Sequence, residues 1–311
     1  MPLQSSRGNG AHSLNDISLV GSGDIEPLAD VRFRRAQPDL IPFITAYYFV
    51  EISGPGGCVV EDILHPEWGN LRFHTGEDWD VAIGQCQFAT PRAATLFGPT
   101  SLARPVRGRP GLVTGVGFTP QGWAHLIGTS AANLADKFEP ACHYLPGMAS
   151  LDIALASAAS DDARVELLDA YFSQRSHACP PHDPRIDVIA IALNQADDVH
   201  VEELARRVDM TITQLSRACR RWFGFPAKIL LRRQRFLRTL AQLLAPEGQL
   251  IGQIVDETYY DQSHFNREFR YFMGMAPRAY FARPRAILRP AAANRAREVG
   301  EALQGLHKPR M

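Results

Sequence analysis

Two stretches in the last third of the chain carry arginine, amide and hydroxyl side chains at the spacing of a single helical face. In the first stretch these side chains are Thr213, Ser216, Arg217, Arg220 and Arg221. In the second they are Gln262, Ser263, Asn266, Arg267 and Arg270. A guanidinium can donate two parallel hydrogen bonds to O6 and N7 of guanine, and an asparagine or glutamine amide can pair with N6 and N7 of adenine. Such a face could therefore read DNA bases, although an isolated arginine-rich helix face is more often merely solvated.

The first stretch lies in a predicted pair of short helices. Apolar residues recur at helical spacing over 186–194 and again over 201–208, and Asp209-Met210 then breaks the pattern. Thr211-Ile-Thr-Gln214 has the form of a capping box, so a helix should begin at Thr211 and end at Gly224. Its inward residues would be Leu215, Ala218, Cys219, Trp222 and Phe223. Two short helices with this turn form a helix-turn-helix, whose second helix enters the major groove.

The same pattern recurs in the second stretch. A short helix is expected over Leu250–Val255 and a turn at Tyr259-Tyr260, after which Asp261 can cap a helix from Gln262 to Phe272. This helix would bury Phe265, Phe269 and Phe272. Gly274 would end it, and Pro277 would open a last short helix through Tyr280.

A longer helix should join the two units. Ala227–Leu244 would span about 27 Å as a helix, with an apolar stripe opposite a basic one made of Lys228, Arg232 and Arg235. Successive major grooves lie about 34 Å apart on one face of the duplex. A monomer could therefore read a two-part DNA site.

Residues 185–283 resemble the DNA-binding domain of the AraC/XylS family of transcription regulators. The most specific stretch is Tyr259-Tyr-Asp-Gln-Ser-His-Phe-Asn-Arg-Glu-Phe-Arg270, followed by Phe272-Met-Gly-Met-Ala-Pro277 and Tyr280. Leu204-Ala205, Thr211, Leu215, Arg217 and Gly224 fit the first unit. The chain departs from the family pattern at Thr258, where many members have glycine, at Cys219, which replaces a large apolar residue, and at Pro226, which comes one position early.

The resemblance implies base contacts from seven positions: Thr213, Ser216, Arg217, Gln262, Ser263, Asn266 and Arg267. Within this set, Arg217 and Arg267 suit guanine, and Asn266 or Gln262 suits adenine. Phosphate contacts, which position a protein without specifying sequence, are expected from Arg220, Arg221, Lys228, Arg232 and Arg270. His264 could be a contact or a packed or capping residue.

The N-terminal half should form a β-rich domain. Short apolar runs between Gly and Pro predict strands over 43–52, 56–64, 70–74, 81–88, 93–97 and 111–118. Helices are expected over 121–128, 133–139 and 151–174. This half more faintly resembles the sensor domain of one branch of the same family, on Ala46-Tyr-Tyr-Phe49, Ile63-Leu-His-Pro66, Leu71-Arg-Phe-His74 and Gly115-Val-Gly-Phe-Thr-Pro-Gln-Gly122. That resemblance implies a small cupin-like β-barrel with a cavity.

The predicted fold is therefore α+β in two domains, the second all-α with two helix-turn-helix units and a linker helix. The expected divisions are a flexible lead-in (1–25), a β-rich effector or dimerisation domain (26–175), a proline-rich linker (176–184), the DNA-binding domain (185–285) and a basic tail (286–311) with a helix around Ala291–Leu306.

Charge supports a division of labour between the halves. Lysine plus arginine and aspartate plus glutamate both number 33 in the 311 residues. Yet residues 1–183 carry 12 basic and 20 acidic side chains, residues 184–285 carry 16 and 11, and residues 286–311 carry 5 and 2. Such asymmetry is a hint of nucleic-acid binding confined to the basic half.

Composition and cysteine usage exclude several classes of protein. The chain is 45% apolar and 21% charged, which argues against wholesale disorder. It has no apolar run of about 18 residues and no signal-peptide core, so we expect a cytoplasmic protein without membrane contact. The five cysteines are widely spaced with no CxxC pair, which predicts reduced, mostly buried thiols rather than disulfides or a thiolate zinc site.

These observations favour a DNA-binding transcription regulator over an enzyme. Its expected partners are double-stranded DNA, RNA polymerase and an effector of unknown identity, and the β domain could also form a homodimer. One rival is a metal-dependent enzyme using His65, Glu67 and His74, whose spacing matches no compact ligand run; no metal or other cofactor is expected. GxSxG, P-loop and HExxH motifs are absent. A second rival is a constitutive regulator whose β domain takes no ligand.

Overall fold

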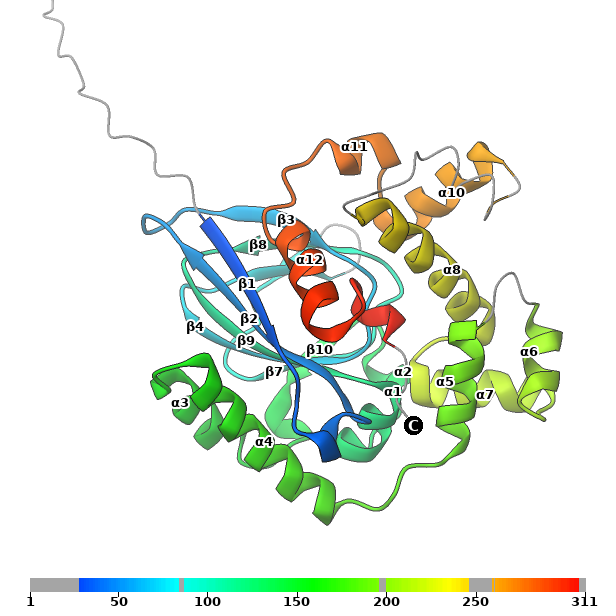
Figure 1. Ribbon diagram of the computed structural model, residues 1–311, viewed down its shortest axis with the longest axis horizontal. Coiled ribbons are helices and arrows are strands. Elements are labelled where there is room, and N and C mark those ends of the chain that lie inside the picture. The colour runs from blue at the N-terminus through cyan, green and yellow to red at the C-terminus, as the bar shows by residue number, and fades with distance from the viewer. Residues whose placement is uncertain (1–27, 84–86, 196–199, 246–258, 260, 308–311) are drawn as a thin grey trace, which may run out of the picture.

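The computed structural model describes residues 28–83, 87–195, 200–245, 259 and 261–307. In Figure 1 a β-rich N-terminal half lies beside a helical half, which occupies the right of the view. The predicted α+β arrangement in two parts is confirmed. No helix among the described residues is long and apolar enough to span a membrane.

Two antiparallel sheets form the β half. The six-stranded sheet has the order β1-β2-β9-β4-β7-β10, and the four-stranded sheet has the order β3-β8-β5-β6. The strands are β1 (Leu28–Arg34), β2 (Ile44–Ser53), β3 (Val60–Leu64), β4 (Asn70–Gly76), β5 (Asp80–Ile83), β6 (Gln87–Ala89), β7 (Thr95–Phe97), β8 (Arg104–Gly108), β9 (Gly111–Phe118) and β10 (Phe138–Pro140).

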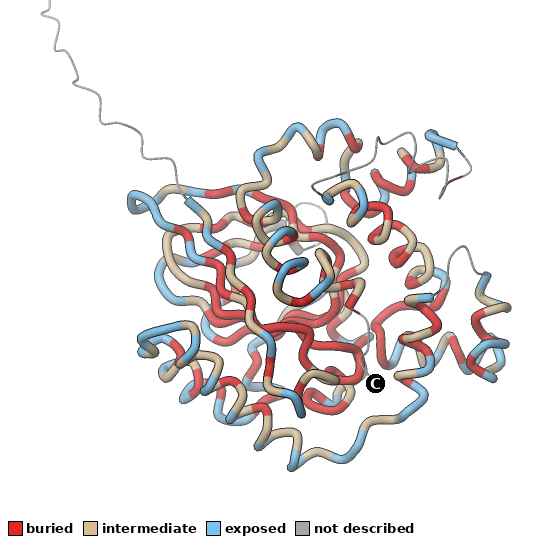
Figure 2. Tube along the Cα trace, viewed as in Figure 1, coloured by how far each residue is buried: buried red, intermediate tan, exposed pale blue. Residues whose placement is uncertain are grey.

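The larger sheet is buried on both faces, as the red strands in Figure 2 show. Along β2, Ala46 and Val50 point toward the smaller sheet and share a core with its Val60 and Val106. Tyr47 points the other way, into a core shared with the long helix α4 (Asp161–Ala178). Side chains that alternate between two apolar layers explain why β2 reads as a nearly continuous apolar run in the sequence.

One long helix and several short ones cover the outer face of the larger sheet. They are η1 (Pro38–Leu40), α1 (Pro120–Gly122), η2 (Trp123–Ile127), α2 (Ala131–Leu134), η3 (Ala141–His143), α3 (Met148–Ser157) and α4 (Asp161–Ala178). Ser160 begins α4 by accepting a hydrogen bond from the backbone N–H of Ala163 at 3.1 Å. The single helix predicted over 151–174 is therefore two helices, separated by this cap.

The helical half contains α5 (Arg185–Gln195), α6 (Val201–Arg207), α7 (Ile212–Phe223), α8 (Ala227–Leu244), α10 (Gln262–Met273) and α11 (Pro277–Phe281). These bounds match the helices predicted around the first unit, the linker helix and the second recognition helix. The helix predicted over Leu250–Val255 and the turn residue Tyr260 lie outside the described residues.

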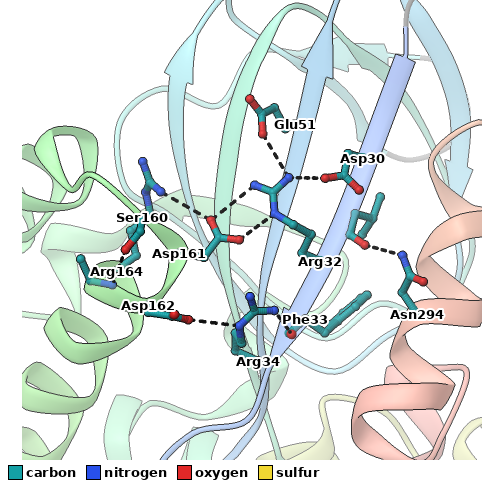
Figure 3. Close-up of polar contacts among 12 residues, drawn as sticks. Asp30, Arg32, Phe33, Arg34, Glu51, Ser160, Asp161, Asp162, Arg164 and Asn294 are labelled. Atoms are coloured by element: carbon teal, nitrogen blue, oxygen red, sulfur yellow. Dashed lines mark hydrogen bonds and ion pairs between the residues drawn. The ribbon is translucent and has the colours of Figure 1, made fainter.

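The C-terminal segment returns to the β half. Helix α12 (Leu288–Val299) and the short helix η4 (Gln304–Leu306) follow α11, and Figure 1 shows α12 beside β1. Figure 3 shows how β1 is held on both sides: Arg32 Nε pairs with Asp161 of α4 at 2.6 Å, and Asn294 Nδ2 of α12 donates to the Val31 carbonyl at 2.7 Å. The segment expected as a basic tail thus contributes a helix packed against the sheet.

Three further details differ from the predictions. Strands β1 and β8 were not predicted, although Val31 and Phe33 alternate with Arg32 and Arg34 in β1. The helix predicted over 133–139 ends at Leu134, because Asp136 takes a left-handed conformation (φ +57°) and β10 follows. Of the four described cysteines only Cys219 is buried, so the expectation of mostly buried thiols was wrong.

Candidate nucleic-acid interface

Helix α7 begins and ends where its sequence predicts. The Thr211 hydroxyl accepts from the Gln214 N–H at 3.2 Å, and Gln214 Oε1 accepts from the Thr211 N–H at 2.8 Å, which completes the capping box. At the other end Gly224 has φ +87°, a conformation that strains any residue with a Cβ. The inward face is apolar, with Leu215, Cys219 and Phe223 buried. The polar face is consequently directed outward.

Helix α10 is built in the same way. Asp261 Oδ1 accepts from the His264 N–H at 2.6 Å, and Gly274 ends the helix with φ +71°. Phe265, Phe269 and Phe272 are buried as predicted. Phe272 stacks on Phe236 of α8 with ring centroids 4.8 Å apart, so the buried face of α10 packs against the linker helix α8. The ring of His264 lies edge-on to Tyr259, the packed arrangement that the sequence left open.

The residues expected to read bases lie on the outer faces of these two helices. Thr213, Arg217, Gln262, Ser263 and Arg267 are exposed, and Ser216 and Asn266 are half-buried. The seven residues form two groups rather than one site, because α7 and α10 pack near different parts of α8. Ser216 Oγ accepts from Arg220 Nη1 at 3.0 Å within α7. The seven residues expected to read bases thus lie on outward faces, as the sequence predicts, and their base contacts stay predictions.

Four of the five expected phosphate-binding residues are exposed, namely Arg220, Arg221, Lys228 and Arg270. The fifth, Arg232, is engaged elsewhere: its Nη2 pairs with Glu268 at 2.6 Å, and its guanidinium lies 4.5 Å from the centre of the Tyr271 ring. The Glu268 carboxylate is buried in α10 and needs this cation. Arg232 therefore ties α8 to α10, and this contact does not favour a phosphate role for it.

The basic face of α7 borders the β half. Arg217, Arg220 and Arg221 line a cleft of about 860 Å³, whose other wall includes His125 and Arg175. The His125 ring is fixed there by hydrogen bonds to the Pro180 carbonyl (2.8 Å) and Ser176 Oγ (2.9 Å). Several cations thus face one opening between the first helix-turn-helix unit and the β half.

A buried arginine on α8 joins the two halves. Arg233 is fully buried; it donates to the Thr100 carbonyl at 2.9 Å and stacks over Trp68 at 3.8 Å. Burial lowers the pKa of its guanidinium. Trp68 also touches the Phe223 ring of α7, with centroids 5.8 Å apart. The sequence analysis did not predict that Arg233 and Glu268 are buried, because charged residues are ordinarily exposed. The helical spacing of Arg233 with the apolar Leu230 and Leu237 was the signal that could have indicated its burial.

The residues of the rival metal site have separate partners. His65 Nε2 lies 2.6 Å from the Tyr280 hydroxyl of α11, and Glu67 pairs with Arg72. Burial lowers the pKa of both His65 and His74 to about 4. Within the described ranges, no group of three or more His, Cys, Asp or Glu side chains could hold a metal ion.

Comparisons with known proteins address the helical half. The sequence profile of a family described as "Helix-turn-helix domain" matches residues 204–283. No curated protein matches the sequence significantly. Among solved structures, the chain is similar to an apo variant of ToxT from Vibrio cholerae (11% identity, 82% of this chain and 96% of that chain, TM-score 0.43). It is also similar to ToxT bound to an unsaturated fatty acid (13% identity, 82% and 94%, TM-score 0.42).

A third similar structure is the C-terminal domain of AraT, a response regulator from Geobacillus stearothermophilus (24% identity, 32% of this chain and 84% of that chain, TM-score 0.29). The profile match covers α7, α8, α10 and α11, which carry both capped helices and their exposed polar faces. The C-terminal part of this chain is therefore a helix-turn-helix domain of the AraC type.

Proposed function

We propose that this chain is a sequence-specific transcription regulator in which α7 and α10 each read bases in a major groove. The observation that carries the proposal is the pair of capped helices with apolar inner and polar outer faces, packed against opposite parts of α8. Arg217 and Arg267 are the proposed guanine readers, with Asn266 or Gln262 for adenine. Arg220, Arg221, Lys228 and Arg270 are the proposed phosphate contacts.

We assign control to the β half. In this proposal, residues 26–175 form an effector or dimerisation domain, residues 176–184 a linker and residues 185–285 the DNA-binding domain, while residues 286–307 pack back on the β half. A signal received there reaches the DNA-binding half through the contacts of Trp68, His65 and α12. The bound protein then contacts RNA polymerase at a promoter. The rival in which the β half takes no ligand remains testable by the ligand titrations described below.

Selection of bound fragments from random DNA by the full-length protein tests the proposal. We expect a two-part motif whose centres lie about one helical turn apart. Four phosphate contacts predict that the logarithm of the binding constant falls with the logarithm of salt concentration with a slope of about −3.6. A single short motif would mean that only one helix reads bases, and no enrichment under any condition would contradict the proposal.

A further inference from the structure

A small cavity lies where α12 crosses the β half. Its volume is about 110 Å³. The strands contribute Val31, Phe33 and Val50 to its wall, and α12 contributes Ala291, Ala292 and Arg295. Most of the lining is apolar, as is usual in pockets for small molecules. None of the described residues of the two helix-turn-helix units lines this cavity, so it is separate from the outer faces of α7 and α10.

One charged group in the wall, Arg295, contacts the Phe33 ring but has two N–H donor atoms without a hydrogen-bond partner among the described residues. Arg295 is only 4% exposed, and its Nε and Nη2 atoms make no hydrogen bond. Burial lowers the pKa of this guanidinium. A buried cation with unpaired N–H groups is costly unless something compensates it. A buried guanidinium that lines an apolar cavity with two unpaired donors has the features of a site for an anionic group.

The other charges of the cavity are already matched. Arg72 Nε donates to the Tyr48 hydroxyl at 2.8 Å, and its Nη2 pairs with Glu67. The negative charge of Glu301 raises the pKa of Arg295 and so favours its charged form. The Arg295 Nε and Nη2 atoms nevertheless make no hydrogen bond to Glu301. His65 is held neutral by burial, which lowers its pKa to about 4. Arg295 is therefore the cation with donors to offer.

We propose that this cavity binds a small monocarboxylate with an apolar body, and that Arg295 receives its carboxylate. Nε and Nη2 lie on one edge of the guanidinium, and two parallel donors on one edge match the two oxygens of a carboxylate. A cavity of about 110 Å³ has room for roughly ten non-hydrogen atoms, at about 10–15 Å³ for each water-sized group. A doubly charged phosphate would leave one charge unmatched in this apolar wall.

The position of the cavity gives its ligand a route to the DNA-binding half, and this step rests on the proposed function. Asp62 Oδ2 accepts from the Ile287 and Leu288 N–H groups at 2.8 Å each, which fixes the start of α12. Beyond α12, the His307 carbonyl accepts from Asn194 Nδ2 of α5 at 3.2 Å. A ligand in the cavity would contact α12. The start of this helix is bonded to the β half, and the segment after its end is bonded to α5 of the helical half.

Calorimetric titration of full-length protein with octanoate, without DNA, tests the assignment. We expect saturable 1:1 binding of octanoate and at least 10-fold weaker binding of octan-1-ol and octylammonium. Arg295→Gln should weaken octanoate binding about 10- to 100-fold, the loss expected for hydrogen bonds to a charged group. The ligand-free Arg295→Gln protein should melt at the same or a higher temperature, because a buried unpaired charge is removed. Arg297→Gln, on the exposed side of the same helix, should bind octanoate as the unchanged protein does.

Ala291→Leu is a second variant, which fills the cavity and leaves Arg295 in place; it should also abolish binding. Equal affinity for octanoate and octan-1-ol would overturn the role of Arg295. No binding by any straight-chain carboxylate from butyrate to decanoate would overturn the site, and so would equal losses in Arg295→Gln and Arg297→Gln. The titration contains no DNA, so a failure to bind octanoate would not contradict the proposed DNA reading. Failure to select a two-part DNA motif would likewise not contradict the proposed ligand site.

Discussion

Arg267 and Lys228 are both exposed cations of the helical half, but we propose a base contact for Arg267 and a phosphate contact for Lys228. Arg267 lies on the outer face of α10, and Lys228 lies in the first turn of α8. Arg267→Ala should cost about 1–3 kcal/mol on the selected DNA and relax the preference at one base position. Lys228→Ala should weaken binding to all sequences alike and reduce the salt slope by about one. Anisotropy titrations on the selected and a shuffled duplex compare them, and equal losses on both duplexes by both variants would contradict these roles.

Arg232 differs from these two residues because its charge is used inside the domain. Arg232→Ala removes the nearer cation of the buried Glu268 carboxylate and leaves the more distant Arg235, whose Nη2 lies 3.9 Å away. We expect a loss of about 1–3 kcal/mol in the free energy of unfolding, measured by urea denaturation. The salt slope of DNA binding should stay unchanged. A reduced slope with unaltered stability would restore the phosphate role.

His65 makes stability depend on pH. Burial, with a smaller contribution from the Arg285 charge, lowers its pKa from 6.5 to about 4 in the folded protein. The unfolded chain therefore takes up a proton first, so the stabilising effect of neutral His65 is complete above pH 6.5 and is lost between pH 6.5 and 4. The loss amounts to about 3 kcal/mol at pH 4. Urea unfolding of His65→Gln should show a shallower decline over this window, whereas the exposed His177→Gln should decline as the unchanged protein does.

At the scale of elements, what could be predicted depends on how far the deciding contact lies along the chain. The starts of α7 and α10 were predicted because Thr211 and Asp261 each bond a group three residues ahead. The helix expected over 133–139 failed because the Asp136 carboxylate accepts from the backbone N–H and hydroxyl of Ser101, far earlier in the sequence. Local propensity cannot reveal such a partner.

Helix α12 is the strongest case of an element fixed from a distance. No side chain of its own caps its start; Asp62 of β3 does so instead, while Oδ1 of the same carboxylate accepts from the Ile63 N–H at 2.7 Å. Asp62→Ala would leave two buried N–H groups and one partly buried N–H group without this acceptor and should lower the unfolding free energy by about 2–4 kcal/mol. Asp62→Asn, which keeps one acceptor oxygen, should lose less. Protease digestion should cut first within 286–307 in Asp62→Ala; equal resistance of all three proteins would show that α12 does not need this cap.

Over the whole molecule, the two halves are joined by contacts that no local pattern announces. The Ala103 N–H donates to the Phe272 carbonyl of α10 at 2.8 Å, His65 meets Tyr280 of α11, and Trp68 stacks with Arg233 of α8. The sequence supported two domains and a boundary near the prolines, because composition and periodicity change there. It could not show that both helix-turn-helix units rest on the β half, since each contact joins residues more than a hundred positions apart.

The Trp68 contact should make the two halves unfold together. Trp68→Leu removes the ring that covers Arg233 and touches Phe223, and leaves that buried guanidinium less compensated. Trp79, equally buried, packs within the β half, so Trp79→Leu is the matched control, and each variant should lose about 2–4 kcal/mol of stability. Hydrogen exchange across a urea series separates them. In Trp68→Leu, α7 peptides should lose protection at lower urea than β4 and β9 peptides, whereas in Trp79→Leu all should lose it together. Coincident loss in Trp68→Leu would mean that the remaining contacts suffice to couple the halves, and signals from the β half would then reach α7 without Trp68.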